Sequence, residues 1–310
     1  MRRNRRRGML EYEYTASRNG TRPARRTEHC RVSEQGYERT GTVGVWVMGK
    51  LRLAVIGAAG RMGRRIVALA TEDADLMVTA ALDAADHPQI GQDAGVVAGV
   101  GPLGVLLRPD LSAPADVAVD FSSPQATDRV LTLCREHRLP LVFATTGISA
   151  EQQRRLEALA QDIPIMQAPN MSLAVNLALK LAQTAAAALK DQDADVEILE
   201  RHHRFKEDAP SGTALEFGRV ISREMGQTAH RHGREGRPGQ RPRNEIGYHA
   251  VRVGDNPGEH NVVFGMLGET VEIIVRATNR DAYAKGALAA AKFVARQRPG
   301  LYSMRDVLKL

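Results

Sequence analysis

The sequence has few cysteines and no long apolar run, and both shortages exclude whole classes of protein. Only two cysteines, Cys30 and Cys134, occur among 310 residues. A disulfide framework and a cysteine metal site are therefore unsupported, and we expect no bound metal. No stretch reaches the roughly 20 consecutive apolar residues that cross a bilayer, and no segment has the pattern of a secretory signal. We expect a cytoplasmic protein with no membrane partner.

A charge excess is also lacking outside the first fifty residues. The formal net charge is +7, and residues 1–50 alone hold 12 Lys+Arg against 5 Asp+Glu. The remaining 260 residues hold 31 of each sign, so the body of the chain is formally neutral. The basic character therefore belongs to the first fifty residues and not to the body of the chain, and we expect no nucleic-acid partner.

The first fifty residues show little apolar periodicity and open with an arginine-rich run over residues 1–7. We expect residues 1–50 to form a disordered basic extension, or to lie upstream of a true start at Met48. An organelle transit peptide is also Arg-rich, but it is poor in acids, and this segment contains Glu11 and Glu13. An arginine arm on nucleic acid is the remaining alternative.

Apolar runs of strand length alternate with helical patterns over residues 51–171. Short apolar runs ending at a glycine or a polar residue are typical of buried parallel strands. Alternation at this spacing predicts βαβ units and a Rossmann-like, doubly wound parallel sheet, within an α/β fold. The expected strands are 51–56, 77–82, 116–121, 141–144 and 163–166, and the expected helices are about 61–70, 124–137 and 149–160.

The pattern changes after residue 171. A long Ala/Leu-rich helix is followed by a strand, a second helix, a Gly/Arg/Pro loop and three extended segments, the last two of which read as an antiparallel pair. This predicts a C-terminal α+β domain with a mixed sheet at residues 172–280, and a nucleotide domain made of residues 51–171 and 281–310. The expected elements are helices 172–189, 213–225 and 281–296, strands 196–200, 245–253, 261–266 and 270–278, and a loop at 228–243.

Three glycines follow the first expected strand at a spacing of three. Gly57, Gly60 and Gly63 stand between that strand and its helix, as in the dinucleotide-binding fingerprint. Glycine permits the tight turn, the close approach of backbone to a pyrophosphate, and close packing of helix on strand. Asp83, about twenty residues beyond the fingerprint, is placed to accept hydrogen bonds from ribose hydroxyls. These features predict a nicotinamide dinucleotide cofactor.

The residue after Asp83 bears on the choice between NADH and NADPH. It is Ala84, and no Arg or Lys occurs before Gln89. A 2′-phosphate would meet a carboxylate without a local cation, so we expect NADH to be preferred over NADPH. Arg61 and Arg64 would compensate in part.

Two polar loops follow the fourth and fifth expected strands. Ligands of open α/β sheets bind at the carboxyl ends of the strands, so these loops are candidates for the nicotinamide and its ribose. The alternative is that both are ordinary turns. Their residues are Ala144, Thr145, Thr146 and Gly147 in one loop, and Ala168, Pro169, Asn170 and Met171 in the other.

Residues 200–215 combine three kinds of chemistry. His202 and His203 can titrate near neutral pH. The segment Pro-Ser-Gly-Thr opens a helix at Ser211, and the free N–H groups of a helix start attract carboxylate or phosphate. The run predicts a site for a small, multiply negative substrate that exchanges a proton, unless it is a solvated loop of charged residues. The cationic side chains that can hold anions are Arg201, Arg204 and Lys206.

These motifs resemble those of 4-hydroxy-tetrahydrodipicolinate reductase, formerly called dihydrodipicolinate reductase. The resemblance extends from about Leu51 to the C-terminus, and its most specific part is the string HH-x-x-K-x-D-x-P-S-G-T-A that begins at His202. Residues 1–50 have no counterpart in the family pattern. Some members also carry Arg directly after the acidic ribose residue, where this chain has Ala84. The matching segments are residues 57–63, 144–147, 169–172, 200–215 and 304–308.

The resemblance implies a reaction and a set of roles. Hydride would pass from NAD(P)H to a cyclic imine dicarboxylate with loss of water, giving tetrahydrodipicolinate in the diaminopimelate route to lysine. His202 would be the general acid/base and Lys206 the proton donor, and the protein would be a homotetramer built through the second sheet. The substrate contacts would be His203, Ser211, Gly212 and Thr213. The cofactor contacts would be Gly57, Ala58, Ala59, Gly60, Arg61, Met62, Asp83, Ala144, Thr145, Thr146, Ala168, Pro169, Asn170 and Met171.

Two other functions stay open at this point. One is another two-domain NAD-dependent dehydrogenase, of the aspartate-semialdehyde or homoserine type. The former needs a nucleophilic cysteine, and Cys134 lies in a helical pattern far from any such motif. The other is a regulator that senses NADH without turnover, which would leave the His/Lys run without a purpose.

Overall fold

The computed structural model describes residues 37–40 and 45–310, and their side chains from Gly49 onwards. The chain divides into two compact units, Met1–Met48 and Gly49–Leu310. In the first unit, β1 (Tyr37–Thr40) pairs antiparallel with β2 (Val45–Met48). The disordered extension expected over residues 1–50 otherwise lies outside the described residues.

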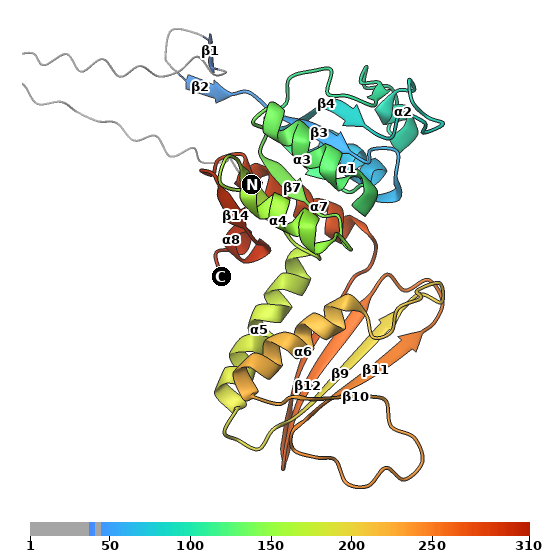
Figure 1. The fold of residues 1–310 in the computed structure, drawn as a ribbon, viewed down its shortest axis with the longest axis vertical. Helices are drawn as coiled ribbons and strands as arrows, with labels where there is room; N and C mark the ends of the chain where they lie inside the picture. The colour runs from blue at the N-terminus through green and yellow to red at the C-terminus, as the bar shows by residue number, and fades with distance from the viewer. Residues whose placement is uncertain (1–36, 41–44) are drawn as a thin grey trace, which may run out of the picture. The chain divides into compact units, whose positions relative to one another are not determined.

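The second unit contains a seven-stranded parallel sheet in the order β14-β8-β7-β6-β3-β4-β5. Its strands β3, β4, β7 and β14 can be located in Figure 1. Its central strands β6 and β7 are buried throughout and apolar except for Asp120 at the end of β6, as expected for a parallel sheet covered on both faces. The strands are β3 (Leu51–Ile56), β4 (Leu76–Leu82), β5 (Leu107–Arg108), β6 (Val117–Asp120), β7 (Leu141–Phe143), β8 (Pro164–Gln167) and β14 (Gly300–Tyr302).

Alternate side chains of the sheet enter two separate cores. Leu53 on β3 packs in a core with Ile66 and Ala290, whereas its neighbour Ala54 packs in a core with Val130 and Leu156. Helices therefore cover both faces, and the predicted doubly wound sheet is confirmed. The helices of the first core are α1 (Arg61–Glu72), α2 (Ala94–Ala98), α7 (Asp281–Val294) and α8 (Met304–Leu308), and those of the second are α3 (Thr127–Glu136) and α4 (Ala150–Leu159).

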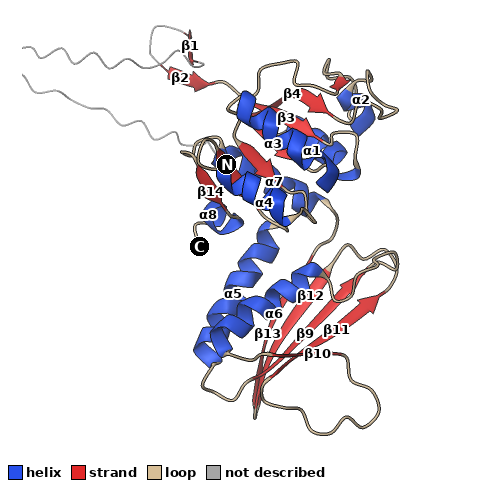
Figure 2. Ribbon diagram, viewed as in Figure 1, coloured by secondary structure: helices blue, strands red, loops and turns tan. Residues whose placement is uncertain are grey.

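A second sheet is mixed, in the order β10-β11-β9-β12-β13. The pairs β10·β11 and β11·β9 are parallel, while β9·β12 and β12·β13 are antiparallel. Helices α5 (Leu173–Leu189) and α6 (Gly212–Met225) cover one face of this sheet (Figure 2). The predicted α+β arrangement with a mixed sheet is thereby confirmed. The strands are β9 (Asp195–His202), β10 (Ala229–His232), β11 (Glu245–Arg252), β12 (Glu259–Met266) and β13 (Glu269–Arg276).

Several boundaries differ from the sequence-based expectations. The segment expected to be a loop at 228–243 contains β10, whose four residues are all exposed and therefore carry no apolar signal. The edge strands β5 and β14 were not expected, since each is short and joins the sheet through its backbone. β9 continues two residues past its expected end and includes His202. Within the described part of the chain, no helix is both long and apolar enough to cross a bilayer.

Candidate active site

The glycine loop lies at the point where the order of the parallel strands reverses, with β4 on one side of β3 and β6 on the other. Gly57 has φ +75°, and a Cβ at this position would lie 2.8 Å from the backbone oxygen of Phe121. A Cβ on Gly63 would lie 2.0 Å from the oxygen of Gly57. Both glycines are therefore required by the fold, and the loop leaves backbone facing the crevice in which such sheets bind ligands.

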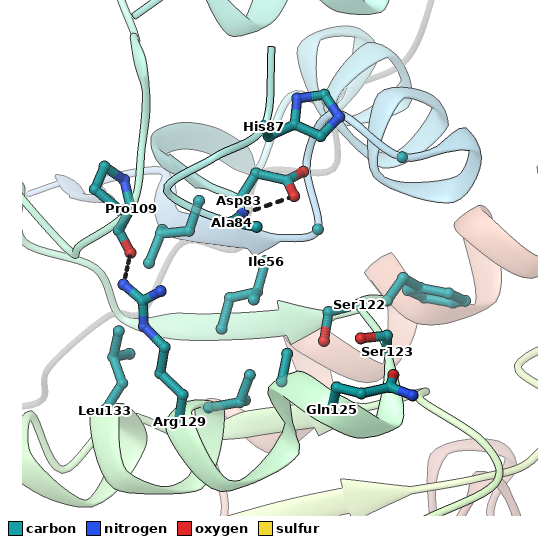
Figure 3. A pocket seen from close by; sticks show the side chains of 16 residues that line it. Ile56, Asp83, Ala84, His87, Pro109, Ser122, Ser123, Gln125, Arg129 and Leu133 are labelled. Atoms are coloured by element: carbon teal, nitrogen blue, oxygen red, sulfur yellow. Dashed lines mark hydrogen bonds between the residues drawn. The ribbon is translucent and has the colours of Figure 1, made fainter. Parts of the chain in front are cut away.

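Asp83 is fixed against this loop by two backbone donors. Ala59 N donates to Asp83 Oδ2 over 2.8 Å, and Ala84 N donates to Oδ1 over 2.9 Å. Asp83, Gly57, Gly60 and Ala84 all line a cavity of about 500 Å³, here called the nucleotide pocket (Figure 3). Its walls are mostly apolar and its rim carries the carboxylate, so the residues present fit a nucleoside with a hydroxylated ribose.

A larger cavity of about 1,030 Å³, here called the cleft, is lined by the loops after β7, β8 and β9 and by residues of α5, α6 and α7. It brings residues that follow the strands of the first sheet next to residues that follow β9. These two groups are more than thirty positions apart in the sequence. Most of the predicted site residues face the cleft, which places the predicted nicotinamide loops beside the predicted substrate site. Those lining the cleft are Met62, Ala144, Thr146, Ala168, Pro169, Asn170, Met171, His202, His203, Lys206, Ser211, Gly212 and Thr213.

Four predicted cofactor residues line neither cavity with their side chains. Ala58 and Ala59 are buried beneath the glycine loop, so any contact they make is through backbone. Arg61 is exposed at the start of α1. Thr145 is buried, and its Oγ1 donates to Asp120 Oδ2 over 2.7 Å. The loop after β7 is thus held to the end of β6, and burial raises the pKa of Asp120.

The cationic cluster expected after β9 is divided by the fold. Alternation along the strand places Arg201 on the face opposite His202, where it lies 3.6 Å from Glu259. Arg204 is exposed outside the cleft. Only Lys206 of the three lines the cleft, and its Nζ donates to Asp208 Oδ1 over 2.7 Å.

Ser211 caps the helix that opens into the cleft. Its Oγ accepts from Ala214 N over 3.2 Å, and its own N–H donates to Glu200 Oε1 over 3.0 Å. The N–H groups of Gly212 and Thr213, in the first turn of α6, have no intrahelical partners. They are the donors available to an anion in the cleft, as the sequence predicted for a helix start at this point.

Two buried histidines lie side by side, and only the first of them, His202, lines the cleft. The rings of His202 and His260 are 5.3 Å apart in an edge-to-face arrangement. Burial lowers the pKa of His260 to about 4, so this ring is neutral near pH 7, and its Nε2 lies 3.0 Å from Ser211 Oγ. Burial also lowers the pKa of His202, against the opposing effect of Glu200.

Sequence reasoning missed Glu200, Arg252 and His260, which surround His202. His202 Nδ1 lies 2.6 Å from Glu200 Oε2, and Arg252 pairs with the same carboxylate. Strand alternation would have placed Glu200 and His202 on one face had the strand been extended by two residues. Arg252 and His260 come from β11 and β12, whose pairing with β9 is not readable from one sequence.

Two family models match most of the chain. Residues 51–171 match the model described as dihydrodipicolinate reductase, N-terminus, and residues 174–308 match the model described as dihydrodipicolinate reductase, C-terminus. The chain belongs to the dihydrodipicolinate reductase family. The resemblance inferred from the motifs is confirmed, and with it the prediction of an oxidoreductase that uses a nicotinamide cofactor on a small-molecule substrate.

Two curated relatives and one solved structure support the same family assignment. A 4-hydroxy-tetrahydrodipicolinate reductase from Rhodopirellula baltica is 55% identical over 270 residues, covering 84% of this chain and 96% of the relative. One from Syntrophus aciditrophicus is 45% identical, covering 83% and 98%. A dipicolinate-bound dihydrodipicolinate reductase from Paenisporosarcina sp. TG-14 has a TM-score of 0.67 at 25% identity, covering 82% of this chain and 97% of that chain. The alternatives of another dehydrogenase class and a non-catalytic sensor thereby lose their support.

Proposed function

We propose that this chain reduces 4-hydroxy-tetrahydrodipicolinate to tetrahydrodipicolinate with loss of water, in lysine biosynthesis through diaminopimelate. The observation that carries the proposal is the cleft in which His202, Lys206 and the first turn of α6 face the loops after β7 and β8. The ligand of the Paenisporosarcina relative, dipicolinate, is a ring with two carboxylates, and it belongs to the same chemical class as the substrate proposed here.

The cofactor would extend from the nucleotide pocket into the cleft. The glycine loop and Asp83 would hold the adenosine half, and the loops after β7 and β8 would hold the nicotinamide half. When bound, the nicotinamide supplies the hydride. We favour NADH over NADPH, because Ala84 leaves Asp83 without an adjacent cation that would neutralise a 2′-phosphate.

The protein's own contribution to the chemistry is the handling of protons. Reduction of a conjugated imine places negative charge on the ring, and a positioned acid must quench it. Lys206 would donate this proton, and His202 would act as the general acid/base. Both line the cleft, and both residue types change protonation state readily when neighbouring charges and burial tune them.

The substrate carboxylates would be held by donors around the same cleft. Gly212 and Thr213 offer backbone N–H groups at a positive helix end, and Lys206 offers a cation. Among the described residues, His203 Nδ1 is a buried polar atom without a hydrogen-bond partner, so it has capacity for a ligand. A dicarboxylate would therefore be oriented at two points.

We further propose a cytoplasmic homotetramer. The face of the second sheet opposite α5 and α6 carries three exposed apolar side chains, Leu199 (39%), Val251 (44%) and Ile274 (42%). An apolar surface on a sheet face is characteristic of a protein–protein contact, and a second copy of this chain is the partner we propose.

The test is an assay of NADH and NADPH oxidation by the purified full chain. The substrate is the condensation product of pyruvate and aspartate semialdehyde, generated in the cuvette, and omission of either precursor is the control. We expect substrate-dependent oxidation that is faster with NADH at subsaturating cofactor. Absence of oxidation with both cofactors would contradict the function, and a preference for NADPH would contradict only the assignment of Ala84.

A further inference from the structure

Glu200 is a fully buried carboxylate in contact with His202, which lines the cleft, and it has no exposed side-chain surface. Arg252 NH2 donates to its Oε1 over 2.7 Å, and Arg252 NH1 donates to its Oε2 over 2.8 Å. Ser211 N donates to Oε1, and His202 Nδ1 lies 2.6 Å from Oε2. A buried charge is tolerated only when paired and hydrogen-bonded in this way, so the fold maintains the carboxylate at a desolvation cost.

The contact with Glu200 determines which nitrogen of His202 is available to a ligand. An ionised carboxylate only accepts hydrogen bonds, so Nδ1 carries a proton and the neutral ring keeps its lone pair on Nε2. Nε2 lies beside Gly258, where a Cβ would come within 3.0 Å of it. The glycine therefore leaves room at the nitrogen that exchanges protons.

Charged and titratable groups from every neighbouring element face His202. Arg252 approaches from β11, His260 from β12, Lys206 from the loop after β9, and Tyr283 from α7 through its hydroxyl near Gly258. Burial lowers the pKa of His202 most, Lys206 and Arg252 lower it further, and Glu200 raises it. Among these described groups, Glu200 is the one that stabilises the imidazolium.

We propose that Glu200, anchored by Arg252, is a positioning residue that orients the imidazole of His202 and fixes its proton on Nδ1. The proposal rests on the proton-transfer role given above to His202. Arg252 also donates to the backbone oxygen of Asp208 over 2.6 Å, so one guanidinium holds both the carboxylate and the loop that carries Lys206. Arg252 therefore constrains the positions of both His202 and Lys206, the two side chains proposed to exchange protons.

Removal of the negative charge of Glu200 and removal of the positive charge of Arg252 must move the pKa of His202 in opposite directions. Glu200→Gln keeps the size and an accepting oxygen, but it removes the anion and leaves Arg252 unpaired, so the pKa of His202 falls. Arg252→Gln removes a cation and leaves the anion of Glu200 uncompensated, so the pKa of His202 rises. A purely structural role would disturb the ring in both variants without this reversal of sign.

The experiment is an NMR titration of the histidine rings in the full chain, with the His202 signal assigned from His202→Gln. It is combined with the pH profile of kcat/KM. In Glu200→Gln we expect a lowered His202 pKa, a kcat lower by about 10-fold or more, and an unchanged affinity for NADH. In Arg252→Gln we expect a raised His202 pKa.

Glu197→Gln is the matched control, because Glu197 lies three positions earlier on β9 and pairs with Arg234 and His249 outside the cleft. It should leave the His202 titration and kcat unchanged. Equal-sign or absent shifts in the two test variants would overturn the proposal. If Glu200→Gln does not fold, Arg252→Gln still decides, because an unmoved or lowered His202 pKa there refutes it. The titration needs no turnover, so a wild-type protein that fails to oxidise NADH would refute the function separately.

Discussion

Asn170 Nδ2 donates a hydrogen bond to Thr213 Oγ1 over 3.1 Å. Asn170 follows β8 of the first sheet, and Thr213 lies in the first turn of α6 above the second sheet. Asn170 Oδ1 also accepts from the backbone N–H of Ser172, the residue that caps α5. The loop proposed for the nicotinamide is thus tied directly to the helix start proposed for a substrate carboxylate, which fixes the distance between the two proposed binding sites.

Replacement of His202 by Gln removes the proposed acid/base and preserves side-chain volume. We expect turnover to fall by about 10²-fold or more, the usual worth of a positioned acid or base. NADH binding, measured by calorimetry, should change little, because the glycine loop, Asp83 and the loops after β7 and β8 are proposed to hold the cofactor and all stay intact. Turnover close to that of the wild type would remove His202 from the mechanism.

Replacement of Lys206 by Ala removes both a proposed proton donor and a carboxylate contact. We expect turnover to fall by about 10²-fold or more, together with a raised KM for the substrate, because one residue serves both purposes. Arg204→Ala is the control, since Arg204 is a cation two positions away that does not line the cleft. Equal losses in the two variants would mean that general positive charge, and not Lys206 itself, matters.

The sequence predicted individual parts of the site, but it did not predict the buried residues that surround His202. The glycine spacing identified Gly57 and Gly63, because the positive φ of Gly57 and the close contact of Gly63 with the oxygen of Gly57 are local properties of the turn. The PSGT signal predicted a helix start at Ser211, and the structure has Ser211 as the cap of α6, because helix starts are set by local interactions. Arg252 and His260 were missed, since they reach His202 only through the lateral order of β11, β9 and β12.

The charge run after β9 illustrates a second limit of sequence reasoning. Arg201, Arg204 and Lys206 look like one cluster along the chain, yet strand alternation sends Arg201 to the opposite face. Their separation depends on how far β9 extends, and strand ends are the least certain part of any sequence-based assignment. A two-residue error there was enough to hide both the split of the cluster and the pairing of Glu200 with His202.

Introduction of a cation beside Asp83 tests the assignment of cofactor preference. Ala84→Arg should shift the ratio of kcat/KM values towards NADPH by about tenfold to a hundredfold, because one charge-assisted hydrogen bond to the 2′-phosphate is worth about 1.5–3 kcal/mol. Ala85→Arg adds the same charge at an exposed neighbour that does not line the nucleotide pocket, and it should have little effect. An unchanged ratio in Ala84→Arg would mean that the residue at position 84 does not determine the choice between NADH and NADPH.

A charge placed on the face of the second sheet opposite α5 and α6 tests the proposed homotetramer. Ile274→Glu should convert a tetramer to smaller species in light scattering, because a carboxylate would be desolvated in the contact. Leu267→Glu is the control, since Leu267 is 99% exposed at the turn between β12 and β13. A wild-type monomer, or a tetramer unaffected by Ile274→Glu, would contradict the proposed interface.

The buried ring of His260 makes the free energy of unfolding depend on pH. An unfolded histidine has a pKa near 6.5, whereas burial lowers the pKa of His260 to about 4 in the folded protein. Between these values the unfolded chain binds the extra proton, so the free energy of unfolding decreases as pH falls from about 6.5 to about 4. The full loss from His260 amounts to about 3 kcal/mol, and His202 adds a loss of the same sign because its pKa is also lowered.

Removal of the titrating ring should flatten this dependence. His260→Gln retains a polar partner for Ser211, and we expect its unfolding free energy, from urea titrations, to fall less steeply over that pH range than that of the wild type. Comparing the two proteins cancels the contributions of carboxylates such as Asp120, whose raised pKa acts in the opposite direction. His137→Gln, at an exposed position, should keep the wild-type slope. Parallel curves for wild type and His260→Gln would mean that folding does not lower the pKa of His260, and the effect assigned to its burial would be wrong.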